Sequence, residues 1–162
     1  SRADARCVGK NECEHPYYAQ RACGISIKKR RMVVLDRSII IDHLRQSEQA
    51  KSWLMKIASK MSKSNLALSM VTIQELYEWK STLDPKKEHY LLSTIAPLTV
   101  ISYTYEVAQL AGELARDCGR PIELADAAIA ATAITHGAQL ATINSKDFIG
   151  IRNLELLDLK TL

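Results

Sequence analysis

Short apolar runs alternate with longer segments of helical periodicity along most of this sequence. Buried strands are expected at the apolar runs, which are 33–35, 66–70, 98–102, 138–142 and 154–157. Helices are expected where apolar residues recur every three or four positions, at 39–45, 49–61, 72–83, 87–95, 104–118 and 123–136. Because strands that alternate with helices form parallel sheets covered on both faces, the pattern predicts an α/β fold with a small, mainly parallel central sheet.

The last of these helices, 123–136, is unusually rich in small side chains. Its alanines are Ala127, Ala128, Ala130, Ala131 and Ala133. Small residues let a helix approach the sheet or a neighbouring helix closely, and Gly137 is a typical residue for its C-terminal cap. We therefore expect close packing that brings Asp126, in the first turn, near the end of the sheet.

The first 31 residues do not share this organisation. They show no helical or strand period, and they hold eight Lys/Arg and three Asp/Glu, a charge of +5, against −1 for the remaining residues. We expect one domain at 32–162, beginning at Met32, with 1–31 as a leader or upstream sequence outside the fold. The alternative is a basic arm ending in KKRR that contacts RNA or a partner. A zinc site formed by Cys7, Cys13, His15 and Cys23 is disfavoured because the spacing lacks a tight cysteine pair.

Composition excludes several classes of protein. The hydrophobic share of 47% and the charged share of 25% are ordinary for a globular domain. No apolar run approaches the roughly 18 residues needed to cross a bilayer, so no membrane association is expected. Cys118 is the one cysteine after residue 31, which excludes a disulfide framework there and predicts a reducing cytoplasm. A nearly neutral domain does not indicate broad nucleic-acid binding through net charge alone.

Acidic residues mark the points where strands are expected to end or helices to begin. They are Asp36, Glu75, Asp126 and Asp147. In an open parallel sheet these ends meet at one crevice, where neighbouring carboxylates repel one another unless a cation lies between them. Oxygen ligands suit Mg²⁺ or Mn²⁺, and such ions promote phosphodiester hydrolysis. The pattern therefore indicates a metal-dependent nuclease.

Each acid also has a simpler structural interpretation. Thr72 and Glu75 fit a capping box, Asp126 complements a helix dipole, and Asn144 with Asp147 fits another capping arrangement. Ser38 is placed either to cap a helix or to orient a water molecule at the metal. Asp42 is interpreted either as solvated surface or as a group supporting the site. The order of the strands, rather than any single acid, favours function.

Four segments resemble PIN-domain ribonucleases, specifically the VapC-like toxins of type II toxin–antitoxin pairs. They are VVLDRSIIIDHL, LALSMVTIQELYEW, GRPIELADAAIAATAITHGAQLATINSKDF and LELLDL. The resemblance implies a PIN-like α/β/α sandwich in which Asp36 and Asp126, helped by Glu75, hold Mg²⁺ or Mn²⁺. It places Asp147 as the fourth catalytic acid. The supporting positions are Ser38, Thr142 and Asn144, and Asn144 competes with Asp147 for the fourth place.

One position departs from the family pattern. The family usually has Thr-Ser or Ser-Ser after the first acid, whereas this sequence has Arg37 before Ser38. That cation stands beside Asp36, where it would either contact substrate phosphate or alter metal affinity. Arg37 and Lys146, with Lys80 and Arg120, are the candidates for contacts to the RNA backbone.

The resemblance also implies a function and partners. The expected activity is endoribonucleolytic hydrolysis of single-stranded or looped RNA, leaving 5′-phosphate and 3′-hydroxyl ends. A cognate antitoxin and a homodimer are expected. The candidate dimer faces are Trp53/Leu54/Ile57 and Tyr77/Trp79, and burial in the core is the simpler explanation of either cluster. The alternative is a catalytically inactive PIN-fold module that binds RNA or protein. Phosphoacceptor receiver domains and haloacid-dehalogenase-type phosphatases are disfavoured because VVLDRS lacks their acidic pairs.

Overall fold

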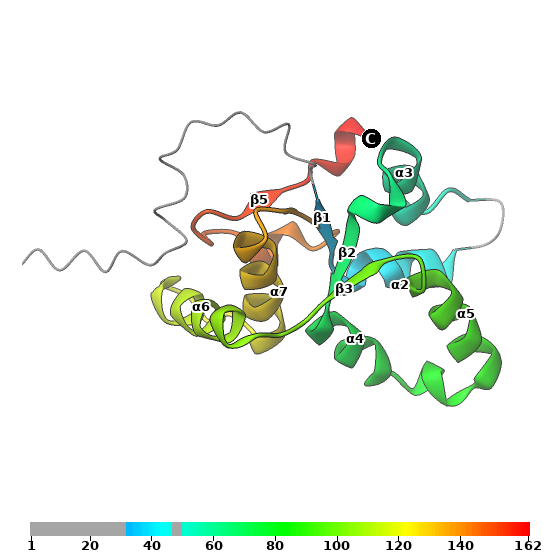
Figure 1. The fold of residues 1–162 in the computed structure, drawn as a ribbon, viewed down its shortest axis with the longest axis horizontal. Helices are drawn as coiled ribbons and strands as arrows, with labels where there is room; N and C mark the ends of the chain where they lie inside the picture. The colour runs from blue at the N-terminus through cyan, green and yellow to red at the C-terminus, as the bar shows by residue number, and fades with distance from the viewer. Residues whose placement is uncertain (1–31, 47–49) are drawn as a thin grey trace, which may run out of the picture.

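The computed structural model describes residues 32–46 and 50–162 (Figure 1). The proposed leader, with its cysteines and KKRR sequence, lies outside the described residues. The described chain begins at Met32, immediately before the first strand, and ends in a short 3₁₀ helix, η5 (Leu159–Thr161).

A five-stranded parallel sheet forms the centre of the domain. Its strands are β1 (Val33–Leu35), β2 (Leu66–Ser69), β3 (Thr99–Ile101), β4 (Gln139–Ala141) and β5 (Glu155–Leu156). Their order across the sheet is β3-β2-β1-β4-β5, and every neighbouring pair is parallel. Chain order therefore reverses direction at β1, so the carboxyl end of this strand is a topological switch point, where open α/β sheets bind their ligands.

Helices cover both faces of this sheet (Figure 1). They are α2 (Arg37–Arg45), α3 (Trp53–Lys60), α4 (Met70–Tyr77), α5 (Pro85–Ile95), α6 (Tyr105–Asp117) and α7 (Leu124–Thr135). The short 3₁₀ helices η2 (Lys63–Asn65), η3 (Lys80–Leu83) and η4 (Ser145–Phe148) lie between the larger elements. The expected α/β/α sandwich with a parallel sheet is confirmed.

The alternation of side chains along β1 divides the core into two layers. Val33 and Leu35 pack with α2, α3, α4 and α5, whereas Val34 packs with α7 and β4 on the opposite face. All three residues are fully buried. A strand covered on both faces reads as a continuous apolar run, which explains why Val33, Val34 and Leu35 are all apolar.

The small side chains of α7 permit the close packing that the sequence predicts. Every residue from Ala127 to Ile134 is buried, and one cluster joins α7 to Val107 and Ala111 of α6. On another side, the Ser69 and Thr132 hydroxyls lie 3.1 Å apart, both fully buried, and this hydrogen bond ties the start of α4 to α7. The helices that carry Glu75 and Asp126 are thereby joined.

Several helix boundaries differ from the sequence-based expectation. The helix expected at 72–83 is α4, which begins after the N-cap Ser69 and ends at Tyr77, with η3 following separately. Thr72 is therefore a buried residue inside the helix, so the capping box of Thr72 and Glu75 is wrong. Ser69 is the N-cap instead, because its hydroxyl accepts a hydrogen bond from the Val71 amide.

Other capping residues also differ. Asp36, not Ser38, is the N-cap of α2, and its carboxylate accepts a hydrogen bond from the Ser38 amide. Asn144 precedes η4 without making a side-chain cap. Asp42 is not free surface, because its carboxylate accepts hydrogen bonds from the Trp53 amide and from Gln46, each at 2.9 Å. It fastens α3 to α2.

Leu54 and Ile57 of α3 belong to the apolar core, so core packing accounts for that candidate dimer face. Tyr77 and Trp79 remain exposed. Within residues 32–46 and 50–162, no helix has the length and apolar character needed to cross a membrane.

The tight fit between α6 and α7 gives a direct test of this packing. Ala131 is fully buried between these helices, whereas Ala115 lies on the exposed face of α6. We expect Ala131→Leu to lower the free energy of unfolding by about 1–3 kcal/mol because the added methylenes have no space. Ala115→Leu should change it by less than about 0.5 kcal/mol. Urea denaturation measures both, and equal effects would contradict the packing described.

Candidate active site at the carboxyl ends of the strands

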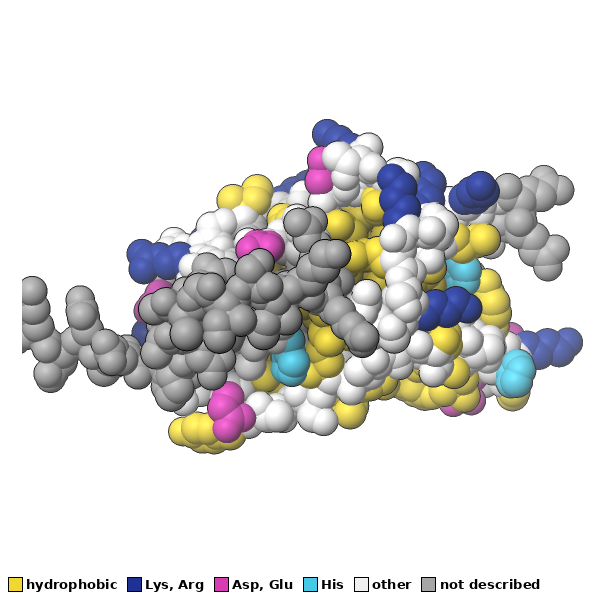
Figure 2. Space-filling model, turned by 45° about the horizontal axis from the view of Figure 1, so that its top comes forward, with side chains coloured by type: hydrophobic (Ala, Val, Ile, Leu, Met, Phe, Trp, Pro, Cys, Tyr) yellow, Lys and Arg dark blue, Asp and Glu magenta, His cyan; other side chains and the backbone are white. Residues whose placement is uncertain are grey.

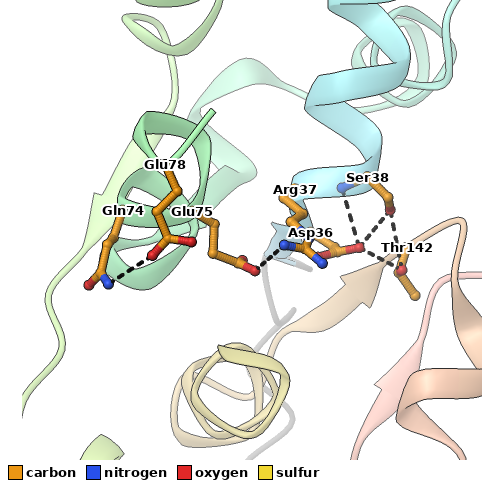
Figure 3. Close-up of polar contacts among 7 residues, drawn as sticks. All are labelled: Asp36, Arg37, Ser38, Gln74, Glu75, Glu78 and Thr142. Carbon is orange, nitrogen blue, oxygen red and sulfur yellow. Dashed lines mark hydrogen bonds and ion pairs between the residues drawn. The ribbon is translucent and has the colours of Figure 1, made fainter. Parts of the chain in front are cut away.

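Asp36 is the most firmly held acid of the crevice. It follows β1 directly, its amide donates to the Ala141 carbonyl at 2.9 Å, and only 4% of the residue is exposed. Its Oδ2 accepts hydrogen bonds from Ser38 Oγ at 2.6 Å and from Thr142 Oγ1 at 2.8 Å (Figure 3). All side-chain hydrogen bonds of Asp36 thus end on one oxygen, which fixes the orientation of the carboxylate.

The two hydroxyls also hold the loop that follows β4. Ser38 Oγ accepts a hydrogen bond from the Ile143 amide at 3.1 Å, and Thr142 Oγ1 accepts one from the Asn144 amide at 3.0 Å. Each hydroxyl therefore accepts from the loop backbone and donates to Asp36. The supporting positions expected at Ser38 and Thr142 do contact Asp36, whereas Asn144 contributes its backbone amide rather than its side chain.

Glu75 projects from α4 towards the same place and is almost completely buried, at 6% exposure. Its Oε1 lies 2.7 Å from Arg37 Nη1, while its buried Oε2 has no hydrogen-bond partner among the described residues (Figure 3). A buried carboxylate oxygen without a partner is uncommon and calls for an explanation. Burial is the main cause that raises the pKa of Glu75 to about 7; Arg37 opposes the rise, and Asp36 and Asp126 add to it.

Asp126 lies in the first turn of α7 and is partly buried. Burial is again the main cause that raises its pKa, here to about 6, followed by the negative charges of Asp36 and Asp147. The influence of these charges means that the four acids expected from sequence share one electrostatic neighbourhood. The charge on α7 is therefore more than a complement to the helix dipole.

Asp147 is the outermost of the four acids. It belongs to η4 and is exposed, and it borders a hollow beside Asp126. The residues lining this hollow are Arg37, Arg120, Pro121, Glu123, Asp126 and Asp147. Asp147 thus lies exposed at the edge of this hollow, whereas Asp36 and Glu75 are buried.

Arg120 has a role that sequence reasoning missed. Its guanidinium donates hydrogen bonds to the backbone carbonyls of Asp147, Ile149 and Pro121. These contacts fasten the segment that carries Asp147, so Arg120 positions an acid in this structure. Lys146 and Lys80 are exposed, and the side chain of neither makes a hydrogen bond or ion pair with the described residues.

The carboxylate oxygens of these acids are the donors that a hard divalent cation prefers. In this structure, however, the side chains do not surround a metal position. Within the described residues, no three Asp, Glu, His or Cys side chains converge closely enough to hold a metal ion together. The guanidinium of Arg37 lies against Glu75 instead. Glu75 Oε2 still has no partner, and burial raises the pKa values of Glu75 and Asp126, so Arg37 compensates the grouped carboxylates only in part.

Comparison with known proteins agrees with this architecture. The sequence model of the PIN domain matches residues 33–153. The chain belongs to the PIN-domain family. This PIN domain is 33% identical over 118 residues to Ribonuclease VapC10 of Mycobacterium tuberculosis, across 70% of this chain and 83% of that protein.

Solved structures share the fold of this PIN domain. DNA-bound VapBC from Salmonella typhimurium has a TM-score of 0.67 at 22% identity, covering 80% of this chain and 98% of that one. A toxin–antitoxin complex from Klebsiella pneumoniae has a TM-score of 0.62 at 24% identity, covering 78% and 97%. At these identities the likeness establishes the fold.

The raised pKa of Glu75 predicts a pH-dependent stability of the metal-free protein. Because the folded protein holds this proton up to about pH 7 and the unfolded chain releases it near 4.5, the stabilising contribution is complete below about 4.5 and is lost as the pH rises through about 7. We expect wild-type stability to fall relative to Glu75→Gln between pH 5 and pH 8. Urea denaturation in EDTA measures this difference, and a pH-independent difference would contradict it.

Removing Arg120 should loosen the segment that carries Asp147. We expect Arg120→Ala to accelerate amide hydrogen exchange across residues 144–149 by about tenfold, because several carbonyl contacts are lost together. Arg116→Ala is the matched control, since within residues 32–46 and 50–162 the one ion pair of Arg116 is with the exposed Asp117. Unchanged exchange in Arg120→Ala would show that the loop is held by other contacts.

Proposed function

We propose that this PIN domain is a metal-dependent endoribonuclease and the toxin of a toxin–antitoxin pair. The observation that carries the proposal is the grouping of Asp36, Glu75 and Asp126 at the switch point of the sheet, in a chain that is 33% identical to a ribonuclease. The two buried acids interact electrostatically with a third, a costly arrangement that a purely structural role does not require.

Asp36, Asp126 and Glu75 are the residues proposed to hold Mg²⁺ or Mn²⁺, because hard cations favour such oxygen donors. A bound cation would supply Lewis acidity towards water and would offset charge on the scissile phosphate. Ser38 and Thr142 hold Asp36 in one orientation, so this ligand is already placed before any cation arrives. Asp147 completes the acidic set at the entrance.

The proposed substrate is RNA, whose phosphates would reach the crevice through the hollow beside Asp126 and Asp147. Arg37 lines this hollow, and Lys146 is exposed next to Asp147, so both are suited to contact the RNA backbone. Arg120 is less suited to contact RNA, since its guanidinium already donates hydrogen bonds to backbone carbonyls. The lone Cys118 after residue 31 supports a reducing cytoplasm as the place of action.

The proposed partners are a cognate antitoxin and a second copy of the chain. Support comes from the shared fold with the VapBC and toxin–antitoxin structures described above. Large apolar side chains also reach the surface of this domain, among them Leu83, Tyr105 and Leu124. On the face drawn in Figure 2, apolar groups emerge between scattered charged ones.

Substitution of Asp36 tests the proposed activity. We expect Asp36→Asn to reduce Mg²⁺-dependent cleavage of single-stranded RNA by about 100-fold or more, because the best-held ligand loses its charge. Glu106→Gln removes an exposed acid of α6 and should cleave like the wild type. Product ends are identified by sequencing, and circular dichroism checks that both variants fold.

Equal cleavage by Asp36→Asn and the wild type would disprove the site. A wild type that binds Mn²⁺ but cleaves no RNA would favour the alternative, an inactive PIN-fold module that binds RNA or protein.

A further inference from the structure

Arg37 occupies an unusual position for a cation. It is the first residue of α2, directly after the N-cap Asp36, and the first turn of that helix contains no acid. The N-terminus of a helix carries partial positive charge, so a guanidinium there is locally unfavourable. Its position therefore needs compensation from elsewhere in the fold.

The compensation comes from the acids of the crevice. Arg37 Nη1 lies 2.7 Å from Glu75 Oε1, which joins α2 to α4 across the end of the sheet (Figure 3). Arg37 also lines the hollow that contains Asp126 and Asp147. Within the described residues no other Arg or Lys makes an ion pair with any of the four crevice acids.

The two partners differ in their freedom to move. Glu75 is buried, whereas the Arg37 side chain is 36% exposed and lines a second hollow shared with Ser38 and Asn144. A long, partly exposed side chain that borders two open spaces can leave the carboxylate without disturbing the core. Glu75, whose second oxygen is buried without a partner, cannot follow it into solvent.

We propose that Arg37 is a built-in counter-cation that holds Glu75 in the metal-free protein and competes with the divalent cation for this carboxylate. The inference rests on the proposed function, since it concerns the same acids. Metal binding would displace the guanidinium from Glu75 into the adjoining hollow. Arg37 would thus lower the affinity for metal while keeping the metal-free crevice folded.

The competition follows from charge alone. A guanidinium and a divalent cation that share one carboxylate repel each other, and this repulsion is strong where solvent is excluded. An Arg37→Gln substitution removes the repulsion and leaves Glu75 free for metal. It also leaves the grouped acids without their cation, which destabilises the metal-free fold.

Titration of the whole 162-residue chain with Mn²⁺ at one fixed pH, followed by calorimetry, tests the proposal. We expect Arg37→Gln to bind Mn²⁺ about tenfold more tightly than the wild type. Arg37→Lys keeps the charge and should stay within about threefold of the wild type. Arg45→Gln removes an arginine from the far end of the same helix. Its Mn²⁺ affinity should also stay within about threefold of the wild type, because the Arg45 guanidinium faces Trp79 rather than an acid.

A double-variant cycle locates the effect. If Arg37 acts through Glu75, the gain from Arg37→Gln should shrink to less than about threefold in a Glu75→Gln background, because the shared carboxylate is absent. Thermal unfolding provides a second measurement that needs no catalysis. In EDTA, Arg37→Gln should unfold at a lower temperature than the wild type. Saturating Mn²⁺ should raise the unfolding temperature of Arg37→Gln by more than it raises that of the wild type.

The results that overturn the inference are distinct from those that overturn the nuclease. Unchanged or weaker Mn²⁺ binding by Arg37→Gln would overturn it, as would an equal gain from Arg45→Gln or the absence of binding in every variant. Binding by Arg37→Gln alone would support it. If the wild type cleaves no RNA but the Mn²⁺ affinities of the variants follow the expected pattern, the nuclease proposal is rejected and the competition between Arg37 and metal still stands.

Discussion

The hydrogen bonds that hold Asp36 are the interaction on which the rest of the site depends. Ser38 comes from the start of α2, and Thr142 lies at the end of β4, more than a hundred positions later in the chain. Both donate to the same carboxylate oxygen and accept from the loop backbone after β4. The carboxyl ends of the two central strands are therefore joined through one acid, and the crevice is built around it.

Close packing of α7 brings the other acids to this point. A helix with larger side chains would stand further from the sheet, and Asp126 would move away from Asp36 with it. The buried hydrogen bond between Ser69 and Thr132 joins α4 to α7, so that Glu75 and Asp126 approach from neighbouring helices. The alanines of α7 thus serve the site as well as the core.

Grouping these acids has a cost in stability. Burial and mutual repulsion raise the pKa values of Glu75 and Asp126, so the ionised forms are disfavoured in the folded protein. Arg37 offsets part of this repulsion at Glu75. The same electrostatic imbalance would attract the proposed divalent cation, so stability without metal and metal binding would be opposed at this site.

Sequence alone determined the elements that repeat regular patterns. The apolar run ending at Asp36 identified the central strand, and the alternation of strands and helices identified the parallel sheet, because burial on two faces leaves a strong periodic signal. The same logic placed Asp36, Glu75, Asp126 and Asp147 at one edge of the sheet.

Tertiary structure decided the contacts between distant positions. It assigned the cap of α4 to Ser69 instead of Thr72, used Asp42 to fasten α3, turned Arg120 towards the loop backbone and paired Arg37 with Glu75. Such polar contacts have no sequence period, because they depend on which side chains the packed helices leave within reach of one another.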